Sequence, residues 1–398
     1  MNLSMSSNPI RQTPISTRLP VLKVLGLGGG GCNAINRMIE LGLKNIEFIA
    51  ANTDHQALGR CLATKKVHLG PKVTRGLGAG GNPAIGEAAA EESYRELGEA
   101  LAGADMVFLT AGMGGGTGTG AISVAARVAR SIGAIVVAVV TTPFSFEMGR
   151  RSRNAQEGLA KLRPFTDTLI TVPNDRLLYV APRDLSLDLT FRLADDVLRQ
   201  GIQGITELVT EPGLINVDFA HVRRLMQMGG GSIMSIGYGQ GEDKARKAIE
   251  QALHHPLLES ICMSNAQGII ANFTGGSDLT FLEVVDALNF LQDESANQAE
   301  IIPGVINNEN MQDRTQVILI ITGLGGTPID QAITGAENSI EKKPAVAAPV
   351  ASEIQPVAAA AQAKTAAPAE VPAMELDTNP ATNLDLPAFM RRRVRYAS

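Results

Sequence analysis

After a short polar segment, the chain alternates short apolar runs with longer stretches of helix-forming composition. Each run has the length of a strand and is apolar at successive positions, which predicts strands buried on both faces. The runs are Val21–Leu27, Ile46–Asn52, Asp105–Thr110 and Ala134–Thr141, and the helices expected between them are Asn33–Leu41, Glu87–Ala102 and Ala121–Ile132. This alternation predicts a parallel sheet with right-handed crossovers.

A second group of apolar runs surrounds a long helical stretch. The helix is expected over Leu189–Glu211, because Pro212 and Gly213 end it. Strands are expected at 168–172, 232–239, 266–274, 299–306 and 315–323, with a further helix over Glu242–Leu253. We therefore expect an α/β fold with a Rossmann-like parallel-sheet domain, a long central helix and a second α/β domain with a mixed sheet.

Composition divides the remainder of the chain. Residues 327–383 are rich in Ala, Pro, Thr, Val and Glu and contain no aromatic residue, which is typical of a disordered linker. The segment LDLPAFMRRR at 384–393 joins an apolar cluster to arginines and predicts a short docking peptide. The expected division is a disordered arm at 1–20, a first domain at 21–188, the central helix at 189–211, a second domain at 212–326, the linker at 327–383 and a partner-binding peptide at 384–398.

Composition and charge narrow the function class. The 398 residues are 44% hydrophobic and 19% charged, which is a globular composition. The net charge of −5 argues against nucleic acid as a partner. Cys32, Cys61 and Cys262 are far apart in sequence and favour neither a disulfide framework nor a zinc site, so we expect a reducing, cytoplasmic location. We expect neither a membrane span nor an export signal.

Three glycine-rich stretches carry the candidate chemistry: GLGGGGCNAINRM at 26–38, TRGLGAGGNPAIG at 74–86 and AGMGGGTGTG at 111–120. Two of them follow expected strands, and the carboxyl ends of parallel strands are where such sheets bind ligands. Glycine lets backbone N–H groups approach a ligand closely, and such donors before a helix favour phosphate. One loop alone could be only a tight turn, but three at one sheet edge predict a nucleotide with several phosphates.

The first stretch also fits the dinucleotide pattern G-x-G-x-x-G through Gly26, Gly28 and Gly31, with Asp54 as a ribose-binding acid. An oxidoreductase of that type would leave the other glycine-rich loops without a role. Neither the first stretch nor the one at 111–120 ends in the Gly-Lys-Ser/Thr of a P-loop. Backbone dipoles must therefore offset the phosphate charge.

The segment GGGTGTG at 114–120 resembles the signature of the tubulin superfamily of GTPases, and its surroundings are most similar to the bacterial division-ring branch. The resemblance extends through NTDHQAL, TRGLGAGGNP, PFSFE, PNDRLL, ADDVLRQGIQGI and PGLINVDFA. It covers Val21 to about Gly323 and returns at 384–392. It implies GTP and GDP as ligands with Mg²⁺, GTP hydrolysis, head-to-tail homopolymers and a cytokinetic ring at the mid-cell septum.

The resemblance also assigns roles to single residues. It implies phosphate loops at Gly29, Gly30, Gly31, Cys32 and Asn33 and at Gly116, Thr117 and Gly118, with Gly80 and Gly81 near the γ-phosphate, Glu147 and Arg151 at the ribose and phosphates, and Asn174, Asp195 and Asp196 at the guanine. A carboxylate suits guanine, because it accepts from the N1–H and amine that adenine does not offer as a pair. The alternative is that Asp195 and Asp196 only cap or solvate a helix.

Three residues in the expected nucleotide-binding region depart from the pattern of the family. Cys32 replaces the last glycine of a run, and Met148 and Gly149 stand where glycine and a basic residue are common. Cys32 is small and keeps its backbone N–H. We therefore expect nucleotide binding to survive these changes.

No candidate base lies among the glycine-rich loops. The resemblance places the catalytic loop after the long helix, with Asn216 and Asp218 matching and His221 where a second acid is expected. Asp195 and Glu211 on one helix would be roughly 24 Å apart. Asp218 would therefore act on the nucleotide of a neighbouring subunit, which implies a head-to-tail filament.

His221 affects the rate of GTP hydrolysis that we expect. We expect slow hydrolysis because an acid is missing at His221, unless the imidazole serves as the base. One alternative is that Asp218 is only the N-cap of the next helix. Another is a paralogue that binds GTP and forms filaments with little or no hydrolysis.

The resemblance gives the C-terminal peptide Leu384–Arg393 the role of holding division partners or a membrane tether. Leu386, Phe389 and Met390 would form its buried face. The alternative is a disordered basic end whose arginines contact anionic lipid weakly.

Overall fold

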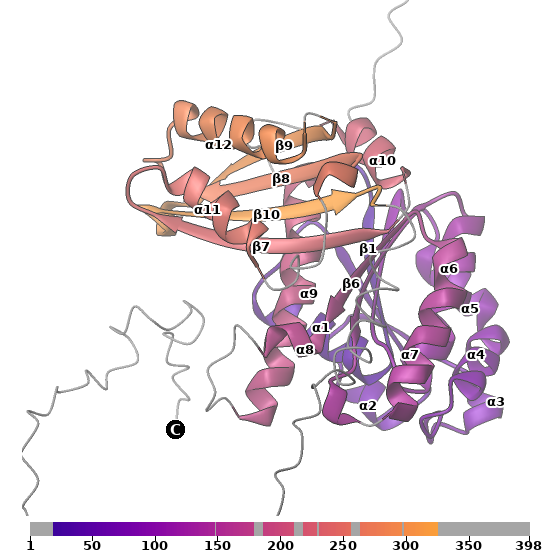
Figure 1. Ribbon diagram of the computed structural model, residues 1–398. Helices are drawn as coiled ribbons and strands as arrows, with labels where there is room; N and C mark the ends of the chain where they lie inside the picture. Colours follow the sequence, from indigo (N-terminus) through magenta and orange to yellow (C-terminus); the bar gives the residue numbers. More distant parts are fainter. Residues whose placement is uncertain are drawn as a thin grey trace, which may run out of the picture. The chain divides into compact units, whose positions relative to one another are not determined.

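The computed structural model describes residues 19–147, 149–178, 186–210, 218–228, 231–255, 263–296 and 298–324 (Figure 1). All structural statements below concern these residues. The predicted arm before residue 19, the linker at 327–383 and the peptide at 384–398 lie outside them. Within them, no helix combines the length and the apolar composition needed to cross a membrane.

The described strands form one ten-stranded sheet in the order β3-β2-β1-β4-β5-β6-β7-β10-β8-β9. Its first part consists of β1 (Leu22–Leu27), β2 (Glu47–Asn52), β3 (Lys65–His68), β4 (Met106–Gly112), β5 (Ile135–Thr142) and β6 (Thr168–Pro173). Every pairing within this part is parallel, which confirms the predicted parallel sheet. The short edge strand β3 was not predicted, because its sequence KKVH lacks an apolar run.

The second part of the sheet is mixed, as predicted. It contains β7 (Ser232–Gln240), β8 (Gly268–Gly275), β9 (Glu300–Asn307) and β10 (Arg314–Thr322). Strand β10 pairs antiparallel with β7 and β8, whereas β8 and β9 are parallel. The two parts meet at a single registered pair, Ile170 of β6 and Ser232 of β7.

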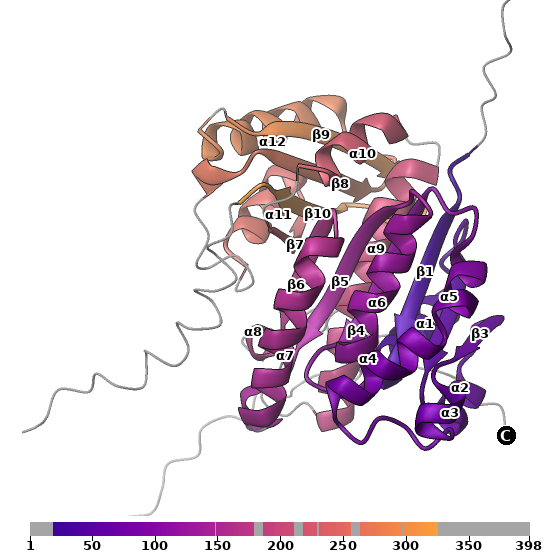
Figure 2. The ribbon, with the colours of Figure 1, turned by 90° about the vertical axis from the view of Figure 1, so that its right-hand side faces the viewer.

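Helices cover both faces of the parallel part (Figure 2). The described α-helices are α1 (Gly28–Glu40), α2 (His55–Arg60), α3 (Pro71–Thr74), α4 (Pro83–Glu92), α5 (Tyr94–Leu101), α6 (Thr117–Ser131), α7 (Gly149–Leu162), α8 (Asn174–Leu177), α9 (Leu187–Thr210), α10 (Phe219–Met226), α11 (Lys244–Leu253) and α12 (Phe281–Glu294). One core lies between the strands and α4 to α7, and another lies between the strands and α1, α9 and α10. A third core lies between β7 to β10 and the helices α11 and α12.

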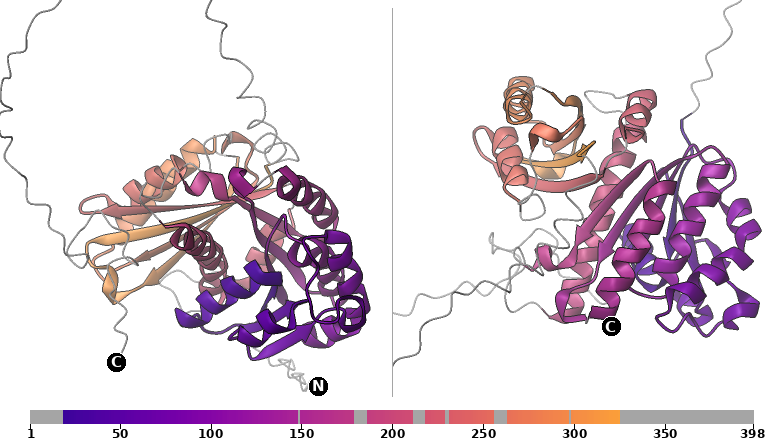
Figure 3. Two further views of the ribbon diagram at one scale, coloured as in Figure 1. Left: turned by 90° about the horizontal axis from the view of Figure 1, so that it is seen from below. Right: turned by 45° about the vertical axis from the view of Figure 1, so that its right-hand side comes forward.

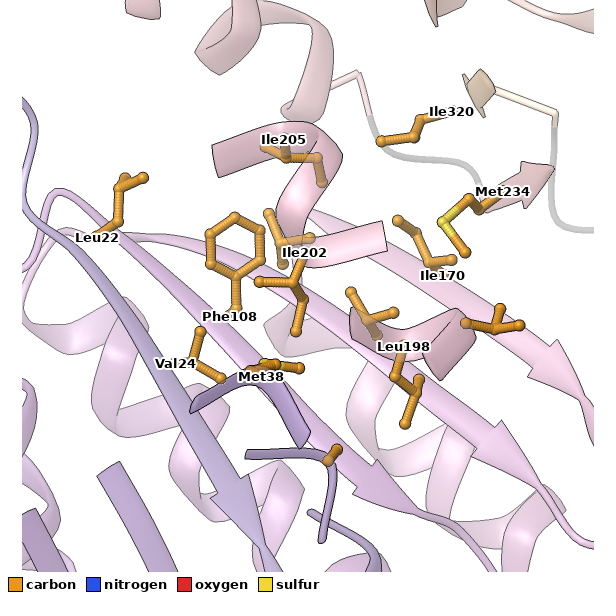
Figure 4. Close-up of a cluster of buried hydrophobic side chains, with 14 of the residues drawn as sticks. Leu22, Val24, Met38, Phe108, Ile170, Leu198, Ile202, Ile205, Met234 and Ile320 are labelled. Carbon is orange, nitrogen blue, oxygen red and sulfur yellow. The ribbon is translucent and has the colours of Figure 1, made fainter. Parts of the chain in front are cut away.

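Helix α9 lies between the two groups of strands (Figure 3). Its buried residues Leu198, Ile202 and Ile205 share a core with Phe108 of β4 and with Ile320 of β10 (Figure 4). Gly204 permits a close approach, since a Cβ atom there would lie 3.0 Å from Cδ1 of Ile318. The helix is therefore packed against both parts of the molecule.

Among the helix boundaries that differ from the sequence prediction, two have an evident structural basis. Helix α1 begins at Gly28, so the glycine run forms the first turn of that helix. The predicted helix Glu87–Ala102 is divided at Ser93, where φ is −100° and ψ is 25°. The Ser93 hydroxyl accepts a hydrogen bond from the Gly70 N–H at 3.0 Å and donates to the His68 carbonyl at 3.3 Å. These tertiary bonds hold the break, and the local sequence does not reveal them.

Candidate nucleotide site

Two glycine-rich loops lie at the ends of neighbouring strands. Strands β1 and β4 are paired in parallel, with Gly26 opposite Thr110, and each leads into a helix through glycines. We call residues 28–33 the first loop, residues 112–118 the second loop and residues 74–86 the third loop. The prediction that the first two loops share one edge of the sheet is confirmed.

The three loops pack backbone against backbone. A Cβ atom added to Gly28, where φ is +70°, would lie 2.8 Å from the Gly118 nitrogen, so the first and second loops touch. A Cβ added to Gly116 would lie 2.8 Å from the Asn82 nitrogen, which joins the second loop to the third. The Thr53 and Thr117 hydroxyls are hydrogen-bonded at 2.6 Å. The sequence prediction that all three loops converge is therefore confirmed.

Other glycines of the same loops face open space. Cβ atoms added to Gly29, Gly80, Gly81 or Gly115 would meet no atom within 4 Å. Gly80 and Gly81 have φ values of +57° and +72°, so a side chain there would also be strained. Gly29 lies in the first turn of α1, and Gly115 lies just before α6. The first N–H groups of a helix have no partner within the helix, so the open backbone at these two positions suits an anion.

Further contacts join the second and third loops to α7. Glu147 and Arg151 form an ion pair, and the Glu147 carboxylate also accepts from the Phe144 N–H at 2.9 Å. Asn154 donates to the carbonyls of Gly114 at 3.2 Å and Gly81 at 3.4 Å. Sequence reasoning missed Asn154, because no helix was predicted over α7 and no motif marked this residue.

A group of aromatic side chains and a buried asparagine form another part of the candidate site. Phe144 stacks on Phe146, with ring centroids 5.0 Å apart, and meets Phe191 of α9 edge to face at 5.5 Å. Asn174, at the end of β6, is 5% exposed, and its Oδ1 atom is buried without a hydrogen-bond partner among the described residues. A buried acceptor of this kind is costly unless a ligand satisfies it.

The two adjacent acids of α9 have different surroundings. Burial raises the pKa of Asp195 to about 7, the charge of Asp196 adds to the rise, and Arg37 and Arg192 oppose it. Asp196 accepts from Arg199 Nε at 2.8 Å and from Gln200 Nε2 at 2.7 Å. A carboxylate has about four acceptor positions, so these bonds leave Asp196 able to accept from a ligand as well.

Asp54, the acid that a dinucleotide site would require, is engaged elsewhere. It is the N-cap of α2, and its Oδ1 accepts from the Ala57 N–H at 3.0 Å. Its backbone also pairs with Leu77 of the third loop. The geometry thus gives Asp54 a structural role.

Asp218 and His221 lie at the other end of α9, on α10 (Figure 1). Asp218 is the N-cap of α10, with Oδ1 accepting from the Ala220 N–H at 3.0 Å, so the predicted cap is present. Both side chains are exposed. Asn216 and Met148 lie outside the described residues. A helix of 24 residues such as α9 is roughly 36 Å long, and it separates these side chains from the glycine-rich loops.

The chain is similar to known proteins over nearly all of its described length. Residues 21–182 match the family described as Tubulin/FtsZ family, GTPase domain, and residues 230–325 match the FtsZ family, C-terminal domain. An empty FtsZ dimer from M. jannaschii matches with 43% identity and a TM-score of 0.73, over 77% of this chain and 89% of that one.

Two further structures are similar. A point mutant of M. jannaschii FtsZ matches with 43% identity and a TM-score of 0.74, over 77% of this chain and 92% of that one. CetZ2 from Haloferax volcanii, solved as a GTPγS-bound protofilament, matches with 19% identity and a TM-score of 0.68, over 81% of this chain and 98% of that one. At that identity the likeness to CetZ2 concerns the fold alone.

Proposed function

Because the chain belongs to the FtsZ family of tubulin-like GTPases, we propose that it binds GTP at the three glycine-rich loops and assembles head to tail into filaments. These filaments would form the cytokinetic ring at the mid-cell septum of a dividing cell. One observation carries the proposal: the three loops are joined through their backbones while Gly29, Gly80, Gly81 and Gly115 remain open. A phosphate chain fits such a surface, since its oxygens accept from several N–H groups at once.

The resemblance to the family supports the proposed roles at the phosphates. Gly29, Gly30, Gly31, Cys32 and Asn33 would offer the first turn of α1, and Gly116, Thr117 and Gly118 that of α6, with Gly80 and Gly81 near the γ-phosphate. Glu147 and Arg151 would lie at the ribose and phosphates. Mg²⁺ would be held mainly by phosphate oxygens and water, as is usual for this ion. The domain boundaries given above, with 21–188 as the GTP-binding domain, are part of the same proposal.

The guanine base would lie against the aromatic and polar side chains described above. The buried Oδ1 of Asn174 needs a donor, and the acids Asp195 and Asp196 are acceptors for the N1–H and amine of guanine. Adenine does not offer that pair of donors, and its own N1 acceptor would face a carboxylate. GTP is therefore preferred to ATP in this proposal.

Hydrolysis would require two subunits. Asp218 and His221 lie at the far end of α9 from the glycine-rich loops of their own chain, and Asn216 would act with them. A head-to-tail contact brings the α10 end of one subunit onto the nucleotide of the next, and repetition of unlike contacts builds an open filament. Because the Asp218 cap uses only Oδ1, Oδ2 can orient the attacking water.

His221 favours a second candidate function. A neutral imidazole supplies no negative charge where the family pattern has an acid, so the expected hydrolysis is slow and the polymers long-lived. In the limiting case the protein is a filament-forming paralogue with scarcely any hydrolysis. The peptide Leu384–Arg393, outside the described residues, would bind division partners or a membrane tether, and the protein would act in the cytoplasm.

A mixing experiment tests the shared site. Gly29→Asp adds a carboxylate at an open position in the first turn of α1, where a negative charge suits the helix but repels phosphate. Asp218→Asn keeps an oxygen for the cap and removes the charge. Each variant alone should be inactive. In an equal mixture one interface in four pairs the two intact faces, so about a quarter of the natural activity should return.

The controls for this test are Gly29→Ala, which keeps the backbone donors without a charge, and mixtures of each variant with itself. Co-sedimentation must confirm that both variants enter the same polymers. No recovered activity in mixed polymers would contradict a site shared between subunits.

A further inference from the structure

The fold brings together two cysteines that are distant in sequence. Cys32 lies in the first turn of α1 and Cys61 directly after α2, and both are free thiols with exposures of 3% and 4%. The Cys61 thiol donates to the Cys32 carbonyl at 3.7 Å, so the two residues are in direct contact. No local sequence pattern indicates this contact, because it depends on how α1 and α2 pack.

The surroundings make the two sulfur atoms unequal. The neighbouring Cys32 thiol lowers the pKa of Cys61, with help from the N–H groups of Ala63 and Leu62 and the charge of Lys66, against the effect of burial. The neighbouring Cys61 and burial both raise the pKa of Cys32. A thiolate beside a protonated thiol is the arrangement of an attacking and a resolving cysteine.

We propose that Cys32 and Cys61 form a reversible intramolecular disulfide when the protein meets a hydroperoxide, and that this bond weakens nucleotide binding at the first loop. The second half rests on the proposed function, because Cys32 belongs to the loop assigned to phosphate. The first half concerns only the two sulfur atoms and is independent of it.

The chemistry balances with one peroxide. The Cys61 thiolate attacks a peroxide oxygen, the O–O bond breaks, and the released hydroxide takes a proton to become water, leaving a sulfenic acid. The Cys32 sulfur then attacks the sulfenic sulfur and gives up its proton as the second water leaves. The two sulfur atoms lose two electrons in all, and these reduce hydrogen peroxide to water. A dithiol restores both thiols by exchange.

The bond would strain the first loop. Sulfur atoms in a disulfide lie about 2.0 Å apart, closer than any hydrogen-bonded contact between thiols. Cys61 cannot simply swing inward, since the next residue, Leu62, donates its N–H to Asn36 Oδ1 of α1 at 2.7 Å. Gly31 cannot yield either, because a Cβ there would lie 2.5 Å from the Thr110 carbonyl. The required movement therefore distorts the turn that holds the open backbone donors.

The residues on either side of Cys61 are exposed to solvent. Arg60 is exposed, and Leu62 is 49% exposed. Only a modest opening of the segment after α2 is needed to admit hydrogen peroxide. The third cysteine, Cys262, lies outside the described residues and serves as an internal reference thiol.

The test uses the full chain, treated with hydrogen peroxide in the absence of nucleotide and then alkylated under denaturing conditions. Peptide masses should reveal a Cys32–Cys61 link lacking two hydrogen atoms, with Cys262 still alkylated. The affinity for a fluorescent GTP analogue should fall at least about tenfold, which corresponds to about 1.4 kcal/mol, and dithiothreitol should restore it. Cys61→Ala should bind GTP as the natural protein does and should not respond to peroxide.

Each other outcome overturns part of the proposal. A disulfide through Cys262, or oxidation without a link, refutes the pairing. An intact link with unchanged affinity refutes the regulation, as does a peroxide effect that persists in Cys61→Ala or in the matched Cys61→Ser. If the reduced protein binds no GTP, the proposed function and the nucleotide half fall together, while the peptide masses still decide whether the disulfide forms.

Discussion

At the loop end of α9 the candidate phosphate-binding surface consists of backbone, whereas at the α10 end the candidate catalytic groups are side chains. The backbone surface depends on glycines whose missing Cβ atoms allow three loops to touch. The other end depends on the chemical identity of Asp218 and His221. A backbone surface therefore tolerates a residue such as Cys32, whose N–H remains, but a side-chain site changes with a single replacement. The predictions below test this contrast.

Loss of the Asp218 charge should have the largest effect. Asp218→Asn should lower the rate of GTP hydrolysis by about 10²- to 10⁴-fold while leaving GTP affinity and the α10 cap in place. Turnover per polymerised subunit measures the first, and fluorescent GTP titration measures the second. Asp243→Asn, at the exposed start of α11, is the matched control and should be silent. If the affinity for GTP fell as much as the rate of hydrolysis, Asp218 would take part in GTP binding.

A charge at the open backbone should have the next largest effect. Gly29→Asp should weaken GTP binding by about 100-fold, because the carboxylate lies where phosphate is expected, and Gly29→Ala should bind normally. Equilibrium dialysis against labelled GTP measures both, with thermal unfolding as a check that the variants fold. If the alanine variant were as defective as the aspartate variant, the phosphate would not lie at this turn.

Restoring an acid at the α10 end should have a smaller effect of opposite sign. His221→Asp should raise the turnover per polymerised subunit at least about tenfold, since the second carboxylate returns. If the imidazole of the natural protein serves as the base, the variant will be no faster, and the natural rate will instead collapse below about pH 6.5. A pH profile of both proteins separates these cases.

The smallest expected effect concerns Asp195 in nucleotide-free protein. Its pKa is raised from 3.8 to about 7, so between these values the folded state binds the proton more strongly than the unfolded state. The free energy of unfolding should therefore fall as pH rises through that window. Urea unfolding at several pH values measures the slope, which should flatten in Asp195→Asn. An unchanged slope would mean that Asp195 titrates normally.

The same contrast explains what the sequence could predict. Runs such as Ala134–Thr141 are recognisable because both faces of a parallel strand are buried, and the glycine clusters are recognisable because a Cβ atom at positions such as Gly28 and Gly116 would clash with the neighbouring loop. The predicted family and the α/β fold with parallel and mixed parts are confirmed. The dinucleotide alternative is wrong, since the chain belongs to another family. The roles of the individual site residues remain predictions.

Features that depend on tertiary contacts escaped prediction. The break at Ser93 is held by bonds to Gly70 and His68. Asn154 reaches two loops from a helix whose sequence shows no clear start. Cys32 and Cys61 meet only because two helices pack. None of these contacts leaves a local pattern, since each partner is distant in the chain.

The length of α9 has a mechanical meaning for the proposed filament. The helix is anchored in the same core as strands of both parts of the sheet, so it can act as a rigid spacer between the two faces of a subunit. Successive nucleotides along a filament would then be separated by a distance that cannot be shorter than this spacer of roughly 36 Å. The number of residues in α9 would thus set the minimum spacing between subunits of the filament. Insertions in surface loops would leave that spacing unchanged.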